Sequence, residues 1–256
     1  MSDSVGQRAL DRALDEKDLL LVYQPIHVTT TRKVHSVEAL LRQRRESGEI
    51  REASVITAAA ELGPELYALD SWVVHQAYKD AAHWHSHGST DVRLNVNLSP
   101  REFKNTKMLD RLRGLVTGCG IDSKKINLEI TETSFIAKPD ETMKCLQELK
   151  KLGLSIWLDD FGTGHSSITH LQKFPVDGLK IPKEFIEDAP ADERSRAITR
   201  HLIEMAHDLG IKVTAEGVET EEQLQFLLDH DCDFIQGFLF SKPMPVKELG
   251  KFLAAH

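Results

Sequence analysis

The chain of 256 residues is 41% hydrophobic and 28% charged, which is the composition of a globular protein with a sizeable core. Its formal net charge of −8 argues against binding a large nucleic acid through a basic face, although a small phosphorylated ligand could still bind through metal ions. No stretch resembles a signal peptide or a membrane span. Three cysteines without CxxC spacing, Cys119, Cys145 and Cys232, fit a reducing compartment, so we expect a soluble cytoplasmic protein.

Eight short apolar runs have the composition of buried strands, and amphipathic segments with helical spacing lie between most of them. In chain order the predicted strands are 19–26, 34–42, 93–99, 126–133, 155–161, 178–182, 212–218 and 233–240. The predicted helices are 66–85, 141–153, 195–210 and 220–230, and two of them end in the glycines typical of helix ends, Gly153 and Gly210. Eight alternating units at this length predict a (β/α)8 barrel. An open doubly wound sheet is the second possibility, but its glycine-rich first turn is missing.

The first two predicted strands need a different connection from the others. Only residues 27–33 separate them, whereas a parallel pair needs a crossover of a dozen or more residues. They are therefore expected to form an antiparallel hairpin. The predicted fold class is α/β, a modified (β/α)8 TIM-type barrel with an antiparallel first strand.

Polar side chains mark the ends of seven of the eight predicted strands, where the active sites of barrels lie. They are Glu38, Arg42, Asn97, Glu129, Glu132, Asp159, Asp160, Lys180, Glu216, Glu219 and Gln236. Carboxylate and amide oxygens favour Mg²⁺ or Mn²⁺ over Zn²⁺, and the adjacent Asp159 and Asp160 can hold two ions, as in phosphoester hydrolysis. Taken alone, Asp160 would be read as a turn residue and Lys180 as a surface lysine. The alternating histidines of "HWHSHG" (83–88) are read as a solvated helix end rather than a metal site.

Seven motifs in order carry a resemblance to a known family. They are "VEALLR" (37–42), "NVNLSP" (95–100), "LEITET" (128–133), "LDDFGTG" (158–164), "LKI" (179–181), "AEGVET" (215–220) and "QGFLFSKPMP" (236–245). Together they closely resemble the EAL domain family, from about residue 8 to about residue 252. The resemblance implies a single EAL-type phosphodiesterase domain over residues 1–256. Active members of the family hydrolyse cyclic di-GMP to linear pGpG with two Mg²⁺ or Mn²⁺ ions.

The resemblance also implies a role for individual residues. Metal ligands would be Glu38, Asn97, Glu129, Asp159, Asp160 and Glu216, and the catalytic groups Lys180, Glu216 and Glu38. Substrate contacts would come from Gln24, Leu40, Arg42 and Gln236. Glu132 would anchor the loop "FGTGHSS" (161–167), which resembles the family's lid and dimer-contact loop and contains Gly162 and Gly164; Glu219 would support the site. In this reading Lys180 holds the attacking water.

Two positions depart from the family pattern. Pro182 stands where the family usually has Asp after Leu-Lys-Ile, so it cannot supply that charge, and His165 stands where an aromatic residue is usual. Loss of a supporting group next to a metal site typically lowers activity by about 10–100-fold. A cyclic di-GMP receptor or protein-interaction module without turnover is therefore the second functional hypothesis, and another metal phosphoesterase is the third. The resemblance further implies a homodimer, and sensor or diguanylate cyclase domains outside this chain.

Overall fold

The computed structural model of the protein describes residues 18–45, 47–53, 57, 66–86, 88, 91–100, 108–118, 121–132, 134, 139–163 and 168–255. Its strands are β1 (Leu19–Val28), β2 (Val34–Arg44), β3 (Ile50–Glu52), β4 (Arg93–Asn97), β5 (Ile126–Thr131), β6 (Ser155–Asp159), β7 (Gly178–Ile181), β8 (Lys212–Ala215), β9 (Phe234–Ile235) and β10 (Met244–Pro245). Its helices are α3 (Leu66–Ser86), α4 (Met108–Gly118), α6 (Pro139–Lys151), α7 (Ile168–Lys173), α8 (Lys183–Ile186), α9 (Glu193–Asp208), α10 (Glu221–Asp229) and α11 (Val246–Ala255), with a 3-10 turn, η2 (Ser123–Lys125).

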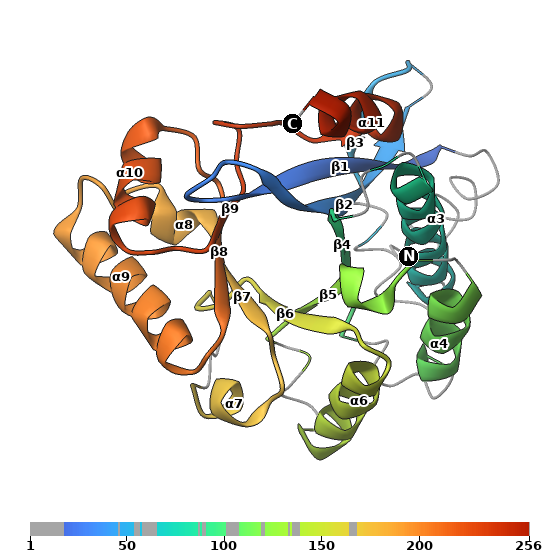
Figure 1. Ribbon diagram of the computed structural model, residues 1–256, viewed down its shortest axis with the longest axis horizontal. Helices are drawn as coiled ribbons and strands as arrows, with labels where there is room; N and C mark the ends of the chain where they lie inside the picture. The colour runs from blue at the N-terminus through green and yellow to red at the C-terminus, as the bar shows by residue number, and fades with distance from the viewer. Residues whose placement is uncertain are drawn as a thin grey trace, which may run out of the picture.

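Eight of these strands close into a barrel. From β2 through β4, β5, β6, β7 and β8 to β9, each neighbour pairs in parallel, and β1 closes the ring by pairing antiparallel with both β2 and β9. The predicted hairpin of the first two strands and the barrel are thus confirmed, and an open sheet is excluded. The strands lie at the centre of Figure 1 and the helices surround them.

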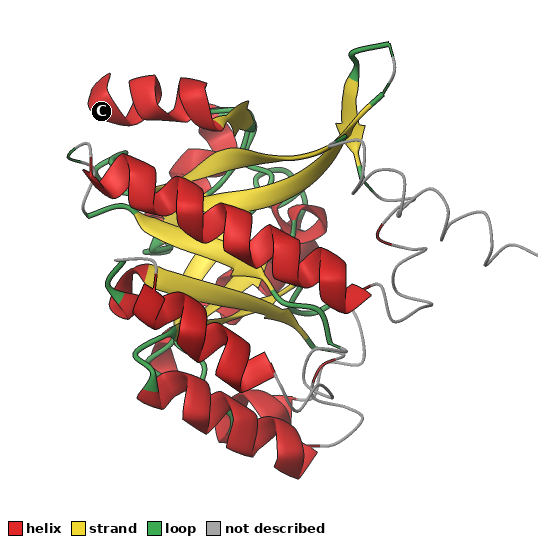
Figure 2. Cartoon of the chain, turned by 90° about the vertical axis from the view of Figure 1, so that its right-hand side faces the viewer, coloured by secondary structure: helices red, strands yellow, loops and turns green. Residues whose placement is uncertain are grey.

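Two short strands extend the sheet beyond this ring. β10 pairs with the middle of β1, and β3 pairs with the far end of β2 through Arg42, Gln43 and Arg44. The β2–β3 pair forms a ribbon that projects past the helices (Figure 2). β2 therefore runs further than the predicted end at residue 42.

The prediction of a strand over residues 233–240 is wrong in its length. Only Phe234 and Ile235 are strand, because the chain then turns: the backbone N–H groups of Phe240 and Ser241 both donate to the carbonyl of Gly237. β5 and β8 likewise end two and three residues before their predicted ends. In each case the polar motif that follows the strand is loop, which leaves its side chains at the mouth of the barrel.

The helices cover the outer face of the barrel as their spacing predicts. The buried residues of α3 recur every three or four positions and include Leu69, Val73, Ala77 and Ala81. The helix ends at Gly153 and Gly210 are confirmed, since both glycines have positive φ (89° and 71°) and lie two residues before the next strand. No helix in the described ranges has the length and apolar character needed to cross a membrane.

The bottom of the barrel interior is filled by aromatic rings. Trp157 and Phe234 lie 5.9 Å apart between centroids, and His35 stacks on Phe234 at 4.0 Å. Gly178 makes room for Trp157, because a Cβ at this position would lie 2.4 Å from the indole ring. This plug closes one end of the barrel and leaves the polar side chains at the other. Elsewhere, Cys145 and Cys232 are free thiols, and Cys119 lies outside the described residues.

Candidate active site

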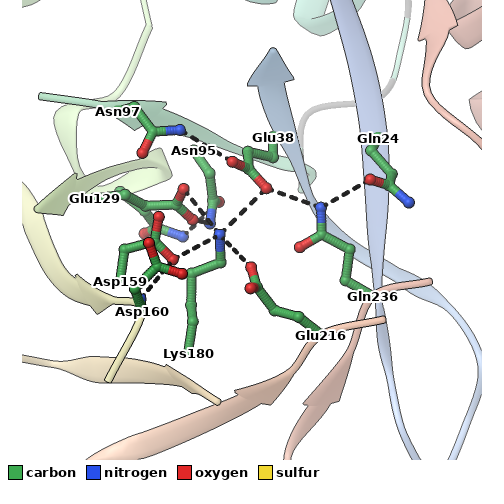
Figure 3. A network of polar contacts seen from close by, with 11 residues as sticks. Gln24, Glu38, Asn95, Asn97, Glu129, Asp159, Asp160, Lys180, Glu216 and Gln236 are labelled. Atoms are coloured by element: carbon green, nitrogen blue, oxygen red, sulfur yellow. Dashed lines mark hydrogen bonds and ion pairs between the residues drawn. The ribbon is translucent and has the colours of Figure 1, made fainter. Parts of the chain in front are cut away.

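The inward-facing side chains at the C-terminal ends of the parallel strands converge on one point (Figure 3). Successive side chains of a strand alternate between its two faces, so a single position near each strand end points inward. The residues brought together are Glu38 from β2, Asn97 from β4, Glu129 from β5, Asp159 from β6 and Lys180 from β7, with Glu216 and Gln236 just after β8 and β9. Gln24 on antiparallel β1 joins them, because it is paired directly with Glu38. The predicted convergence is therefore observed.

Lys180 is the centre of this arrangement. Its side chain is 1% exposed, which excludes a surface lysine. Among the described residues, four carboxylates surround its Nζ atom: Glu216 at 2.6 Å, Glu38 and Glu129 at 3.2 Å, and Asp159 at 3.3 Å. Burial alone would lower the pKa of Lys180, but these carboxylates raise it well above its ordinary value. Lys180 is thus a buried ammonium that neutralises part of an excess of negative charge.

Glu38 is held by donors on both of its oxygens. Its Oε1 accepts from Asn97 Nδ2 at 3.0 Å, and its Oε2 accepts from Gln236 Nε2 at 2.8 Å and from Lys180. Burial would raise the pKa of Glu38, but the charge of Lys180 and the two amide donors outweigh burial and lower it. Gln236 also donates to Gln24 Oε1 at 3.2 Å. The Glu38 carboxylate is therefore ionised and fixed in orientation.

Glu129 rests on a polar layer that the sequence analysis missed. Its Oε2 faces Lys180, and its Oε1 accepts from Asn95 Nδ2 at 2.6 Å; Asn95 in turn accepts from Asn127 at 2.9 Å. Burial and the neighbouring charge of Glu38 raise the pKa of Glu129 well above its ordinary value. Strand alternation could have identified both asparagines, because each lies two residues before an inward-facing site residue.

Asp159, Asp160 and Glu216 form a cluster of oxygen donors. One carboxylate oxygen from each residue lies within 4.8 Å of the others, and in the part of the chain that the structure describes no other group of three or more His, Cys, Asp or Glu side chains meets this criterion. Burial raises the pKa of Glu216 to about 7, and burial together with Asp159 raises that of Asp160. Excess negative charge and oxygen-only donors fit a hard divalent cation such as Mg²⁺ or Mn²⁺.

Asp160 also takes part in a turn, which supports the interpretation of this residue, taken alone, as a turn residue. Its φ is +54°, and its carbonyl accepts from the backbone and the hydroxyl of Thr163. The turn directs the chain into the loop that begins at Phe161. There Glu132 Oε1 accepts from the Gly162 N–H at 2.9 Å, a contact expected of a loop anchor. Gly164 and His165 lie outside the described residues.

The remaining predicted residues lie at the edge of the site. Arg42 donates to the Leu41 carbonyl, and Leu40 is half-buried on the same face of β2 as Glu38. Glu219 pairs with Lys183 at 2.7 Å instead of pointing into the cluster. Within the described residues, no hydrogen bond or ion pair joins Arg42 or Glu219 to the Lys180 network.

Pro182 ends β7 and starts α8. The last paired residue of β7 is Ile181, and Pro182 is the N-cap of α8 with φ −69° and no side-chain capping bond. A proline is tolerated here because an N-terminal helix residue needs no N–H donor. It is buried two residues after Lys180 and supplies neither charge nor a hydrogen-bonding side chain.

His83 and His85 of the 83–88 stretch lie outside the cluster around Lys180. His83 and His85 belong to the last turn of α3, and His85 Nε2 lies 2.8 Å from the Val92 carbonyl. His87 lies outside the described residues. The interpretation as a helix end is confirmed for the first two.

Comparisons with known proteins bear on this geometry. The family model described as "EAL domain" matches residues 7–243. The chain is 36% identical over 98% of its length to "Cyclic di-GMP phosphodiesterase NbdA" of Pseudomonas aeruginosa, and it spans about a third (32%) of the length of that protein. The solved structure "PaMucR Phosphodiesterase, c-di-GMP complex" superposes with a TM-score of 0.90 at 32% identity, covering 95% of this chain and 99% of that one. "EAL Enzyme Bd1971", in its cAMP- and cyclic-di-GMP-bound form, gives 0.93 at 27% identity, covering 98% and 69%.

Proposed function

The chain belongs to the EAL domain family, and on this basis we propose that it hydrolyses one phosphodiester bond of cyclic di-GMP to give linear pGpG, using two Mg²⁺ or Mn²⁺ ions. The observation that carries the proposal is the convergence of Glu38, Glu129, Asp159 and Glu216 on Lys180, with Asn97 and Asp160 beside them. Every donor in this set is an oxygen ligand of the kind that these two ions prefer. The choice of cyclic di-GMP as substrate is supported by the name of the relative NbdA and by the solved complex of the PaMucR phosphodiesterase with c-di-GMP.

In this proposal the residues divide between two ions. Glu38, Asn97, Glu129 and Asp159 would hold the first, and Asp159, Asp160 and Glu216 would hold the second. When bound, the ions would supply Lewis-acid chemistry by polarising the phosphodiester and lowering the pKa of water.

The other residues bind and orient. Lys180 would donate a hydrogen bond to the attacking water, and Glu216, 2.6 Å from its ammonium, would accept the proton that the water loses. Arg42 would bind a phosphate oxygen through its planar guanidinium. Gln24, Gln236 and Leu40 would contact the rest of the ligand, with the two glutamines already oriented by their mutual hydrogen bond.

A receptor that binds cyclic di-GMP without hydrolysing it is the second candidate function. Pro182 favours it, because this buried position two residues after Lys180 has no charged side chain to support the site. All proposed metal ligands are nonetheless present and oriented. We therefore place hydrolysis first.

Hydrolysis of cyclic di-GMP followed by chromatography tests the proposal. The reaction is run with Mg²⁺, with Mn²⁺ and with a chelator. Metal-dependent pGpG is the expected result. Binding without product would instead identify a receptor, and Pro182→Asp would then be the variant to assay. Cleavage of unrelated phosphodiesters at the same rate would favour a different metal phosphoesterase.

The cellular setting is also part of the proposal. Because the chain spans about a third of the curated relative NbdA, regulation by sensor or diguanylate cyclase domains would come from outside residues 1–256. The chain itself is proposed to act as a single cytoplasmic domain and as a homodimer. Light scattering coupled to gel filtration would test the dimer.

A further inference from the structure

Two buried asparagines lie directly below Glu129 and have no role in the function proposed above. Asn95 on β4 and Asn127 on β5 are 2% and 1% exposed, and the register of these strands places them opposite each other. Asn95 precedes Asn97 by two residues and Asn127 precedes Glu129 by two residues, so both share the inward face of their strands with a site residue. They form the layer on which the site rests (Figure 3 shows Asn95).

Hydrogen bonds link the two asparagines to Glu129. Asn95 donates from its Nδ2 atom to Glu129 Oε1, which lies 2.6 Å away. The Oδ1 atom of Asn95 then faces Asn127, which donates from its own Nδ2 at 2.9 Å. Donation therefore runs in one direction, from Asn127 to Asn95 to Glu129.

This arrangement leaves one oxygen of Glu129 for the centre of the site. Oε1 is occupied by Asn95, and Oε2 lies 3.2 Å from Lys180 Nζ. We propose that Asn95, held in place by Asn127, is a positioning residue that fixes Glu129 so that Oε2 is presented to a divalent cation. The proposal rests on the metal-dependent function proposed above, and it assigns a cause for the orientation of one ligand.

A purely structural role explains these asparagines less well. Asn127 Oδ1 is buried and accepts no hydrogen bond within the part of the chain that the structure describes. Buried polar atoms without partners destabilise a fold, and apolar side chains of similar size would avoid the problem. The asparagine layer therefore lowers the stability of the fold, and its function is to provide a fixed hydrogen-bond donor for Glu129.

The test measures binding of Mn²⁺ alone, by calorimetry and by the electron paramagnetic resonance of the ion, in the wild-type protein and in Asn95→Leu. The variant removes the donor to Glu129 and keeps a similar volume. We expect the Kd of the tighter Mn²⁺ site to rise about 10–100-fold, as for other groups that orient metal ligands. In cyclic di-GMP hydrolysis the Mn²⁺ concentration needed for half-maximal rate should rise in parallel, with most of kcat recovered at saturating Mn²⁺.

A matched control is available on β8. Thr214 is 1% exposed and lies two residues before Glu216, as Asn127 lies before Glu129, but no hydrogen bond within the described ranges links it to the site. Thr214→Val removes a buried polar atom and should leave the Kd for Mn²⁺ unchanged.

Asn127→Leu is a second test variant. It leaves Asn95 in place but removes the hydrogen bond that supports Asn95, so a smaller rise in the Kd for Mn²⁺ is expected than in Asn95→Leu. If Asn95→Leu does not fold, Asn127→Leu tests the positioning role of Asn95 in its place.

The outcomes separate this inference from the function on which it rests. Wild-type affinity for Mn²⁺ in folded Asn95→Leu, or in Asn127→Leu if the first variant does not fold, would overturn the positioning role and leave the metal site intact. An equal loss in Thr214→Val would also overturn it, because any buried polar residue would then have the same effect. Failure of the wild-type protein to bind Mn²⁺ would overturn the metal site itself, and the positioning role with it.

Discussion

Two carboxylates at the N-terminal end of the barrel, Asp177 and Asp233, each have partners of their own, whereas at the C-terminal end four carboxylates share Lys180. Asp177, just before β7, accepts from the Ile156 N–H and pairs with Lys150 at 2.5 Å. Asp233, just before β9, accepts from the Val213 N–H at 3.0 Å and contacts Lys212 and His207. Asp177 therefore links the start of β7 to β6 and to Lys150 at the end of α6. Asp233 links the start of β9 to β8 and to Lys212 on β8.

This difference shows what each end contributes. Burial would raise the pKa of Asp233, but Lys212, His207 and the Val213 N–H lower it, so ionised Asp233 stabilises the fold. At the other end the carboxylates around Lys180 outnumber their cation, and burial raises the pKa of Glu129 and Glu216. Carboxylates arranged in this way cost stability and create affinity for additional positive charge. In barrels of this type, the N-terminal face commonly serves stability and the C-terminal face activity.

The largest expected effect is on activity and comes from Glu38→Ala. The variant removes the carboxylate that contacts Asn97, Gln236 and Lys180 at once, and we expect cyclic di-GMP hydrolysis to fall by about 10³-fold or more. Steady-state kinetics at saturating Mn²⁺ measures it. Glu248→Ala on the exposed side of α11 is the control. Wild-type turnover in a metal-replete Glu38→Ala protein would remove Glu38 from the site.

Lys180→Met tests whether the lysine is the counter-ion of the C-terminal end. Without its ammonium four carboxylates lose their shared cation, and breaking a buried pair of this kind costs about 3–5 kcal/mol. We expect lower stability than wild type in chelator and a larger stabilisation by Mn²⁺, together with loss of turnover. Urea unfolding with chelator and with Mn²⁺ measures both states. An unchanged unfolding free energy in chelator would show that the carboxylates do not depend on Lys180.

Asp233→Ala should have the opposite profile. Removing the acceptor of the Val213 N–H and the partner of Lys212 and His207 is expected to lower the free energy of unfolding by about 2–3 kcal/mol. Hydrolysis measured well below the melting temperature should stay within about twofold of wild type, because the residue lies at the far end of the barrel. Asp208→Ala at the exposed end of α9 is the control. A loss of activity greater than the loss of folded protein would show that Asp233, at the N-terminal end of the barrel, also contributes to activity.

The sequence was informative where a side chain follows directly from strand alternation. Asp159 ends an apolar run, and Glu38 and Lys180 each interrupt one, so their inward direction and common edge could be predicted. Asn95 and Asn127 were missed because each lies inside an apolar run: strand alternation places them on the inward face, but a lone asparagine there does not indicate a role. The predicted length of the strand at 233–240 was wrong because "IQGFLF" has the composition of a strand. The turn at Gly237 depends instead on close packing against the backbone of Val218, which the sequence does not reveal. Ion pairs such as Asp233–Lys212 could not be predicted, because they need the three-dimensional neighbourhood of two strands.

The smallest expected effect concerns His35 in the plug at the N-terminal end. Burial, reinforced by the charges of Arg93 and Lys125, lowers the pKa of His35 to about 4, whereas an unfolded histidine titrates near 6.5. Between these two values the unfolded chain binds the proton and the folded protein does not. The contribution of His35 to stability is therefore present in full above about pH 6.5 and is lost as the pH falls toward 4.

A His35→Phe variant isolates this contribution. Phenylalanine keeps the stack on Phe234 but cannot be protonated, so the fall in unfolding free energy between pH 7 and pH 5 should be smaller in the variant by about 1–2 kcal/mol. Urea unfolding of both proteins at the two pH values measures the difference, and His75→Gln on the exposed face of α3 is the matched control. Identical pH dependence in wild type and His35→Phe would mean that the base tolerates a charge in its interior. The difference between the two ends of the barrel would then be supported only by the individual ion pairs of Asp177 and Asp233 at the N-terminal end.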